Sequence, residues 1–88
     1  MADPAVEGFL ALLAARRAPR TVDAYRRDLA GLAAHLGRPP ADANAEEIEG
    51  WLADLRARGQ ASSSVARRGA AARTFYRHLV ALGLRPDN

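Results

Sequence analysis

Cysteine and lysine are both absent from the 88 residues of this chain. Without cysteine the protein can form neither a disulfide nor a thiolate metal site, which suits a reducing compartment. No apolar run approaches the roughly 20 residues that cross a bilayer, and the first residues lack the basic start and apolar stretch of a signal peptide. We therefore expect a soluble, cytoplasmic protein that does not associate with a membrane.

The sequence also offers little for catalysis. His35 and His78 have no carboxylate or thiol at a spacing that would make a catalytic dyad or a metal site, so we expect surface roles for both. Tyr25 and Tyr76 fall on the apolar faces of predicted helices, where packing in the core is the expected role. No glycine-rich loop resembles a phosphate cradle. The residues predict no enzymatic activity, no metal and no cofactor.

Charge is distributed unevenly along the chain. All thirteen basic residues are Arg, against ten acidic residues, for a net charge of +3. Residues 55–86 hold seven Arg and no acid, whereas residues 42–54 hold five of the ten acids. Codon bias in a GC-rich genome is an alternative explanation for Arg in place of Lys, but it does not explain this placement. The asymmetry favours one face that meets a polyanion.

Apolar residues recur at helical spacing throughout the chain, and the alternation typical of strands is missing. The first helix is predicted over residues 4–17, with Asp3 as its N-cap and Pro4 in its first turn. The second is predicted over residues 19–36 and ends at Gly37 in a left-handed conformation. The apolar stripes are Val6, Phe9, Leu10 and Leu13 in the first helix, and Val22, Tyr25, Leu29, Leu32 and Leu36 in the second.

Two further helices follow a stiff connector at residues 38–40. Asn44 and Glu47 have the spacing of a capping box, which predicts the start of the third helix, and Gly59 ends it. Residues 60–64 form a polar joint that is expected to supply the N-cap of the fourth helix, which ends at Gly83. The stripes are Ile48, Trp51, Leu52 and Leu55, then Val65, Ala72, Phe75, Tyr76, Leu79 and Leu82. The sequence therefore predicts an all-α domain made of two helical hairpins packed together.

The second and fourth predicted helices carry arginines opposite their apolar stripes. Arg offers a fork of donors to phosphate oxygens or to a guanine edge, and helix N-termini also favour phosphate. Solvation of an exposed helix face by Arg is the alternative explanation. On the second helix the outward positions are Arg20, Ala24, Arg27, Gly31 and Ala34. The candidate contacts to nucleic acid are Arg20, Thr21, Arg27, Ser64, Arg67 and Arg73, with Arg26 and Arg77 in reserve.

Two segments resemble signatures of the tyrosine recombinases, especially the Xer and phage-integrase branch. The first segment, Thr21-x-x-x-Tyr25-Arg26-Arg27-Asp28-Leu29, is similar to the second-helix signature of that family. The second, Ser64-Val65-Ala66-Arg67-Arg68 followed by Arg73-Thr74-Phe75-Tyr76-Arg77-x-Leu79, is similar to the fourth-helix signature. The resemblance covers nearly all of the chain, and the two motifs together and in order are specific.

The resemblance implies a four-helix, SAM-like core-binding domain over residues 1–84, with residues 85–88 opening a linker to a separate catalytic domain. In that family the domain lies on one side of the duplex and turns its second and fourth helices to the major groove during DNA integration and recombination. The family's catalytic Arg, His and Tyr lie in the other domain. This chain is therefore expected to bind double-stranded DNA without cutting it. We expect a monomer in isolation, from a parent protein that forms tetramers on paired DNA.

The sequence departs from the family pattern in two places. Ala18 stands where a Ser-like cap is usual, which predicts a weaker start of the second helix. Gly69 and Ala72 stand where larger apolar residues are usual, which predicts a thinner core; Gly within a helix also costs about 1 kcal/mol against Ala. Two other functions stay open: a helical protein–protein interaction module that uses the acidic third helix, and a complete small DNA-binding protein of another kind.

Overall fold

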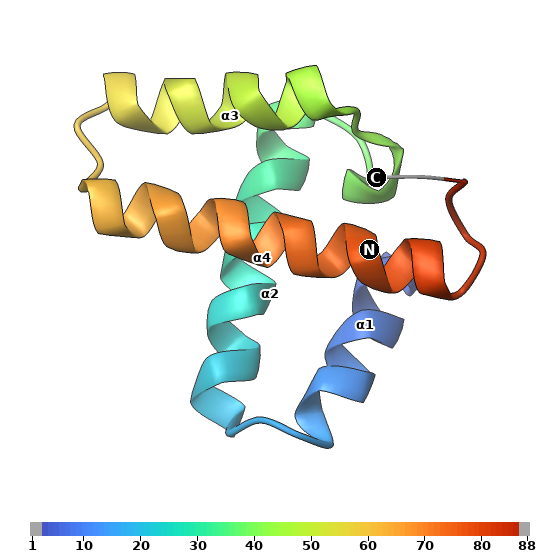
Figure 1. The fold of residues 1–88 in the computed structure, drawn as a ribbon. Helices are drawn as coiled ribbons and strands as arrows, with labels where there is room; N and C mark the ends of the chain where they lie inside the picture. The colour runs from blue at the N-terminus through green and yellow to red at the C-terminus, as the bar shows by residue number, and fades with distance from the viewer. Residues whose placement is uncertain (1–2, 87–88) are drawn as a thin grey trace.

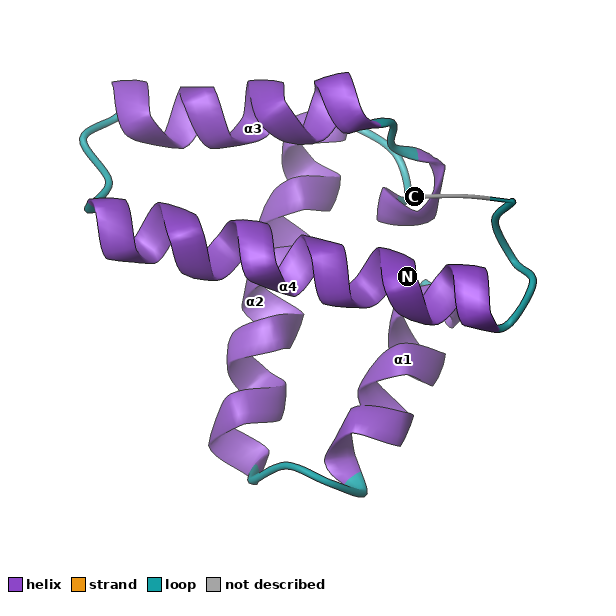
Figure 2. Ribbon diagram, in the orientation of Figure 1, coloured by secondary structure: helices purple, strands orange, loops and turns teal. Residues whose placement is uncertain are grey.

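The computed structural model describes residues 3–86. Over this range the chain forms four α-helices and one short 3-10 helix, and no strand (Figures 1 and 2). The elements are α1 (Pro4–Ala14), α2 (Pro19–Leu36), η1 (Pro40–Asp42), α3 (Ala45–Ala57) and α4 (Ser62–Ala81). The predicted all-α class and four-helix count are confirmed. Within the described residues, no helix is both long and apolar enough to cross a membrane.

The helix ends follow local sequence signals. The Asp3 side chain accepts a hydrogen bond from the Ala5 backbone N–H, 2.9 Å away, and thereby caps α1. Asn44 and Glu47 form both bonds of the capping box that begins α3. Gly37 and Gly83 adopt φ values of 70° and 73°, the left-handed conformation that ends α2 and α4. These boundaries were predicted because each depends on residues adjacent in the chain.

One predicted boundary was wrong. The helix expected over residues 4–17 ends at Ala14, because Pro19 forces Ala18 into an extended conformation (ψ 151°) and the exposed residues before it have nothing to pack against. The joint at residues 60–64 supplies the N-cap of α4 as predicted. That N-cap is Ala61, whose side chain has no acceptor, so α4 begins without a side-chain cap hydrogen bond.

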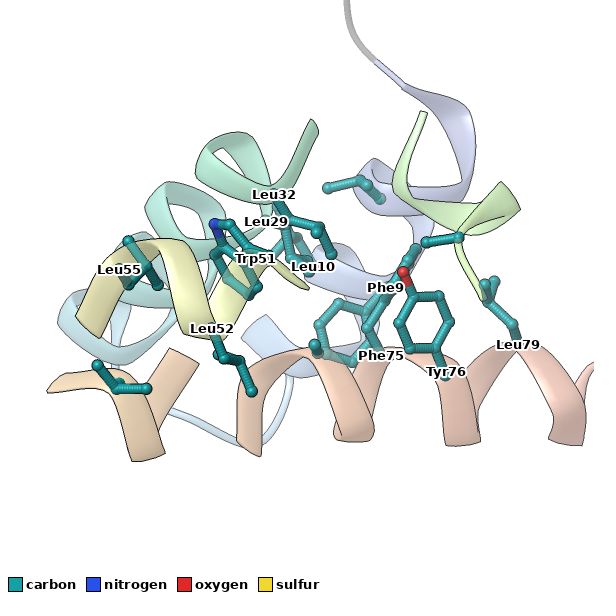
Figure 3. Packing of buried hydrophobic residues seen from close by; sticks show 14 of the residues in the cluster. Phe9, Leu10, Leu29, Leu32, Trp51, Leu52, Leu55, Phe75, Tyr76 and Leu79 are labelled. Carbon is teal, nitrogen blue, oxygen red and sulfur yellow. The ribbon is translucent and has the colours of Figure 1, made fainter. Parts of the chain in front are cut away.

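Helix α4 packs across the other helices and supplies the largest part of the core. Figures 1 and 2 show α4 beside α3 and crossing α2. At the centre, the Phe75 ring meets the Phe9 ring of α1 edge-on, with 5.5 Å between centroids (Figure 3). Leu29 and Leu32 of α2 and Trp51 of α3 close the core around this pair. The predicted apolar stripes are therefore the buried faces, except that Leu82 is exposed.

Gly69 and Ala72 lie on the buried face of α4, and Ala72 is completely buried. A Cβ atom built on Gly69 would lie only 3.3 Å from Leu52 Cδ1 of α3, which is tighter than ordinary van der Waals contact. The Leu52 side chain therefore occupies the space beside Gly69, and a larger residue would fit there only if that side chain moved. The thinner core stays a prediction.

The connector between α2 and α3 is held by the C-terminal half of the chain. Tyr76 donates a hydrogen bond from its hydroxyl to the Pro40 carbonyl, and burial raises the pKa of this tyrosine to about 12. Arg85 donates to the Ala41 and Ala43 carbonyls at 2.7 Å and lies over the Tyr76 ring. The residues after α4 therefore return to the 3-10 turn and fasten it. Residues 87 and 88 of the expected linker lie outside the described residues.

Replacing Gly50 by Ala should raise the free energy of unfolding by about 0.5–1 kcal/mol, because this exposed position lies inside α3 and Ala has the higher helix propensity. No atom lies within 4 Å of a Cβ built there. The measurement is urea unfolding followed by circular dichroism. The matched control is Gly37→Ala, which should destabilise by about 1–2 kcal/mol because its φ is +70°. Equal effects at the two positions would contradict this explanation.

Candidate nucleic-acid interface

An ion pair joins α2 to α4 at their crossing. Asp28 of α2 is only 3% exposed, and its Oδ2 accepts a hydrogen bond from Arg67 Nη1 of α4 at 2.8 Å. The Arg67 side chain itself is 49% exposed. One edge of the guanidinium is therefore tied to a buried carboxylate, while other donors of the same group remain open to solvent.

Three arginines surround the Asp28 carboxylate. Burial raises the pKa of Asp28 above its usual value of 3.8, and the positive charges of Arg67, Arg68 and Arg27 oppose that shift. Burial has the larger effect because a carboxylate loses most of its hydration at this crossing. Three cationic side chains against one acid leave a formal excess of two positive charges here. The arrangement is a cationic centre built around one acid.

Arg68 lies along α2 beside this pair. Its Nη1 atom is 3.7 Å from the position that a Cβ would occupy on Gly31, and Trp51 of α3 approaches the same position to 3.8 Å. Its Nε atom is buried without a hydrogen-bond partner. Arg67 and Arg68 therefore contact α2 at positions 28 and 31, one helical turn apart. We call Arg27, Asp28, Arg67 and Arg68 the crossing cluster.

Two residues of α2 lie differently from what their type or helical wheel suggests. Asp28 is buried, although Asp side chains are almost never fully buried unless they are paired. Gly31 was assigned to the outward face of the second helix, yet it is partly covered by Arg68 and Trp51. The reason is the same in both cases: α3 and α4 cover one side of α2, and a helical wheel drawn for a single helix does not show where neighbours cross it.

The candidate contacts do not all gather at one place. Arg27 and Arg67 both belong to the crossing cluster, and Ser64 lies one turn before Arg67 in α4. Arg73 is exposed and folds back along α4, so that its Nη1 atom is 3.4 Å from a Cβ built on Gly69.

The first turn of α2, which holds Arg20 and Thr21, lies apart from the crossing cluster. It begins at the far end of the α1–α2 hairpin, away from α3 (Figure 1). A shallow hollow there is lined by Ala18, Pro19, Arg20, Thr21 and Asp23. Arg27, Ser64 and Arg67 thus form a central group, Arg20 and Thr21 form an outlying pair, and Arg73 stands apart from both, beside Gly69 and the α3 residues Ile48 and Glu49.

Helices α2 and α4 share N-termini of one kind. Neither has a side-chain hydrogen bond to its cap, and neither carries an acid in its first turn. By contrast, α1 and α3 are capped by Asp3 and Asn44 and carry acids in their first turns. The missing cap of the second helix was predicted from Ala18. The helix dipole favours an anion at both uncapped ends. At α2, however, Pro19 has no N–H and the Thr21 N–H already donates to the Ala18 carbonyl at 3.0 Å, so α4 has the larger share of free N–H groups.

The reserve arginines and the histidines are engaged elsewhere. Arg26 donates to Glu7 at 2.6 Å, and Arg77 donates to the Thr74 hydroxyl at 3.2 Å. His35 lies at the end of α2 as predicted, with its Nδ1 atom 3.9 Å from Asp54. His78 is half-buried with its ring 5.3 Å from the Phe9 ring, so it does not have the surface role that was expected for it. No cluster of three metal-binding side chains exists among residues 3–86.

Asp28 is the residue that sequence reasoning missed. The signal was present, because Asp28 follows Tyr25 by three residues and precedes Leu32 by four, and so shares the buried stripe of α2. An acid on an apolar stripe indicates a buried partner of opposite charge. The sequence did not reveal which Arg supplies that partner, since Asp28 and Arg67 are 39 residues apart.

Fold and site together define a small all-α domain with an arginine-rich crossing of its second and fourth helices. The family model for the phage integrase N-terminal SAM-like domain matches residues 6–83, and the chain belongs to this family.

Among curated proteins, the chain is 46% identical over 85 residues to tyrosine recombinase XerD of Bradyrhizobium diazoefficiens, covering 91% of this chain and 27% of that protein. It is 40% identical to XerD of Rhizobium meliloti, covering 94% and 28%. It is also 40% identical to tyrosine recombinase XerC of Chromohalobacter salexigens, covering 96% and 30%. The chain thus spans less than a third of the length of these relatives. No solved structure matches it significantly.

The substitution Asp28→Asn should change how stability depends on pH. Because burial raises the pKa of Asp28, the folded state holds this proton more tightly than the unfolded state, so ionised Asp28 costs stability at neutral pH. That cost should disappear as the pH falls below 3.8. The free energy of unfolding of the variant minus that of the wild type should therefore be larger at pH 7 than at pH 3, as measured by urea unfolding. The opposite trend would show that the arginines lower the pKa on balance.

Proposed function

We propose that residues 1–84 form the DNA-binding unit of a site-specific tyrosine recombinase, which grips duplex DNA through α2 and α4 during DNA integration or recombination. Membership of the phage integrase SAM-like family supports the recombinase assignment. The relatives that are named tyrosine recombinases support it as well. The observation that carries the choice of surface is the crossing cluster, where arginines of both helices converge with a formal excess of positive charge.

The chemistry of this surface suits a DNA backbone. The exposed donors of Arg67 and the exposed side chain of Arg27 can bind phosphate oxygens, and Arg can also read a guanine edge in the major groove. The uncapped N-terminus of α4, with Ser64 in its first turn, adds backbone N–H donors close to Arg67. Arg20 and Thr21 at the uncapped start of α2 would meet the backbone at a second place. Arg73 extends the surface along α4.

Duplex binding should be weak and strongly dependent on salt. We expect a Kd in the micromolar range typical of non-specific contacts, with log K falling by about 0.9 per phosphate contact for each tenfold rise in salt. Arg27→Glu should weaken binding several-fold at low salt and leave the melting temperature nearly unchanged, because the side chain is exposed. The measurement is fluorescence anisotropy with a labelled duplex across a salt series.

The matched control is Glu46→Arg on the exposed face of α3. It should not weaken binding if α2 and α4 form the interface. If Glu46→Arg abolishes binding and Arg27→Glu has no effect, the acidic α3 face is the functional surface and a protein-interaction module becomes the better assignment. Arg67→Glu is a poor test, because it would place a second carboxylate against buried Asp28.

We further propose that these residues bind DNA without cleaving it. Tyr76 cannot serve as a nucleophile where it stands, because its hydroxyl is bonded to the Pro40 carbonyl and its pKa is raised to about 12. Tyr25 is half-buried with its ring 5.8 Å from the Phe9 ring. Incubation with nicked suicide duplexes should give no covalent adduct by denaturing gel. An adduct mapped by mass spectrometry to either tyrosine would overturn the proposal.

A further inference from the structure

We propose that Asp28 is a positioning residue for DNA binding: it holds the Arg67 guanidinium at the α2–α4 crossing so that the outer donors of that group meet a backbone phosphate. This inference rests on the proposed function and adds a role for an acid in binding a polyanion. It stands on the geometry of one buried carboxylate, one half-exposed arginine and two helices.

Holding the Arg67 side chain in one conformation has an entropic cost. A free Arg side chain must be immobilised when it binds, and this entropy reduces affinity by about two- to tenfold for one rotamer-rich side chain. The 2.8 Å bond from Arg67 Nη1 to Asp28 Oδ2 already restricts this side chain in the free protein. The bond is charge-assisted and shielded from water on the Asp28 side, so it is stronger than a surface pair. Arg67 is therefore ordered before DNA arrives.

The bond to Asp28 also sets the direction in which the other Arg67 donors point. Guanidinium is planar, with five N–H donors in a fixed fork. When Asp28 takes one edge, the remaining donors point away from the protein interior, consistent with the 49% exposure of the Arg67 side chain. Lys could not do the same, because its ammonium is a compact point charge on a flexible stem.

The burial of Asp28 explains how an acid can lie at a surface that binds DNA. Burial of Asp28 is unfavourable for its charge, as its raised pKa shows, and an exposed acid beside DNA would repel phosphate. Asp28 is buried, however, and the surrounding Arg27, Arg67 and Arg68 outnumber it. The cluster therefore stays cationic toward solvent while its acid faces inward. The negative charge of Asp28 is compatible with DNA binding because it fixes the position of the positively charged Arg67 guanidinium.

The sign of the expected effect makes the test sharp. Neutralising any acid should raise affinity for DNA if charge alone matters. If Asp28 positions Arg67, Asp28→Asn should instead weaken duplex binding by about two- to tenfold, since the charge-assisted bond is lost while the side-chain shape is kept. The matched control is Glu46→Gln, which removes an exposed acid from α3, outside the proposed interface, and should leave affinity unchanged or slightly higher. Binding is measured by anisotropy on one duplex at low salt.

A double-mutant cycle shows whether Asp28 acts through Arg67. Arg67→Gln should weaken binding on any duplex and reduce the salt slope by about one, as expected for a phosphate contact. In the Arg67→Gln background, Asp28→Asn should cause no further loss, because the group that it positions is gone. Circular dichroism and melting of each variant confirm that it is folded. The Arg67 side-chain N–H signals in NMR should exchange more rapidly with water in folded Asp28→Asn than in the wild type.

The outcomes separate this inference from the proposed function. If the wild-type domain shows no salt-dependent duplex binding, both fail. If the wild type binds but Asp28→Asn binds as tightly as Glu46→Gln, or more tightly, the positioning role is wrong and DNA binding stands. Equal losses from Asp28→Asn with and without Arg67 would also overturn it, since the effect would then not pass through that side chain. A loss confined to one base position would overturn the phosphate contact.

Discussion

The structure depends on the close packing of α4 against the other helices. Its buried face changes along its length from small residues, Gly69 and Ala72, to large ones, Phe75 and Leu79. At the small end the Leu52 side chain of α3 lies beside Gly69, and at the large end the Phe75 ring packs against the Phe9 ring of α1. A domain of this size has little surface to bury, so one helix that contacts all the others gives it a single core.

This packing also determines where the charges of α4 can lie. A helix whose one side is buried along its whole length must place its arginines on the remaining arc. Arg67 and Arg68 occupy the border of that arc where α2 crosses, and so they contact α2 as well as solvent. The two side chains differ in exposure: Arg67 is half-exposed, whereas Arg68 is partly covered and has a buried Nε atom. Both charges are thereby fixed relative to the core and not only to their own helix.

The sequence predicted what depends on neighbours in the chain. The caps at Asp3 and Asn44, the left-handed ends at Gly37 and Gly83, and the buried stripes follow from local chemistry and helical period. Where two helices cross is decided by the fit of their whole surfaces. The helical wheel of a single helix therefore placed Gly31 on an exposed face and could not show that Asp28 pairs with Arg67. The range 60–64 contained the N-cap of α4, but the sequence did not say that Ala61, and not one of the serines after it, would hold that position. The individual DNA contacts stay predictions.

The first turns of the four helices differ in charge. Acids stand in the first turns of α1 and α3, Glu7 in α1 and Glu46 and Glu47 in α3, where they complement the positive end of the helix dipole and stabilise the fold. Helices α2 and α4 forgo that stabilisation, although each is longer than α1 or α3 and each could accommodate an acid or a polar cap. An anion bound at these ends would supply the missing charge from outside the chain. The positive dipole ends of α2 and α4 therefore have no negative charge beside them within their own helices. These are the two helices that carry the arginines of the crossing cluster, and a phosphate backbone could supply the missing negative charge.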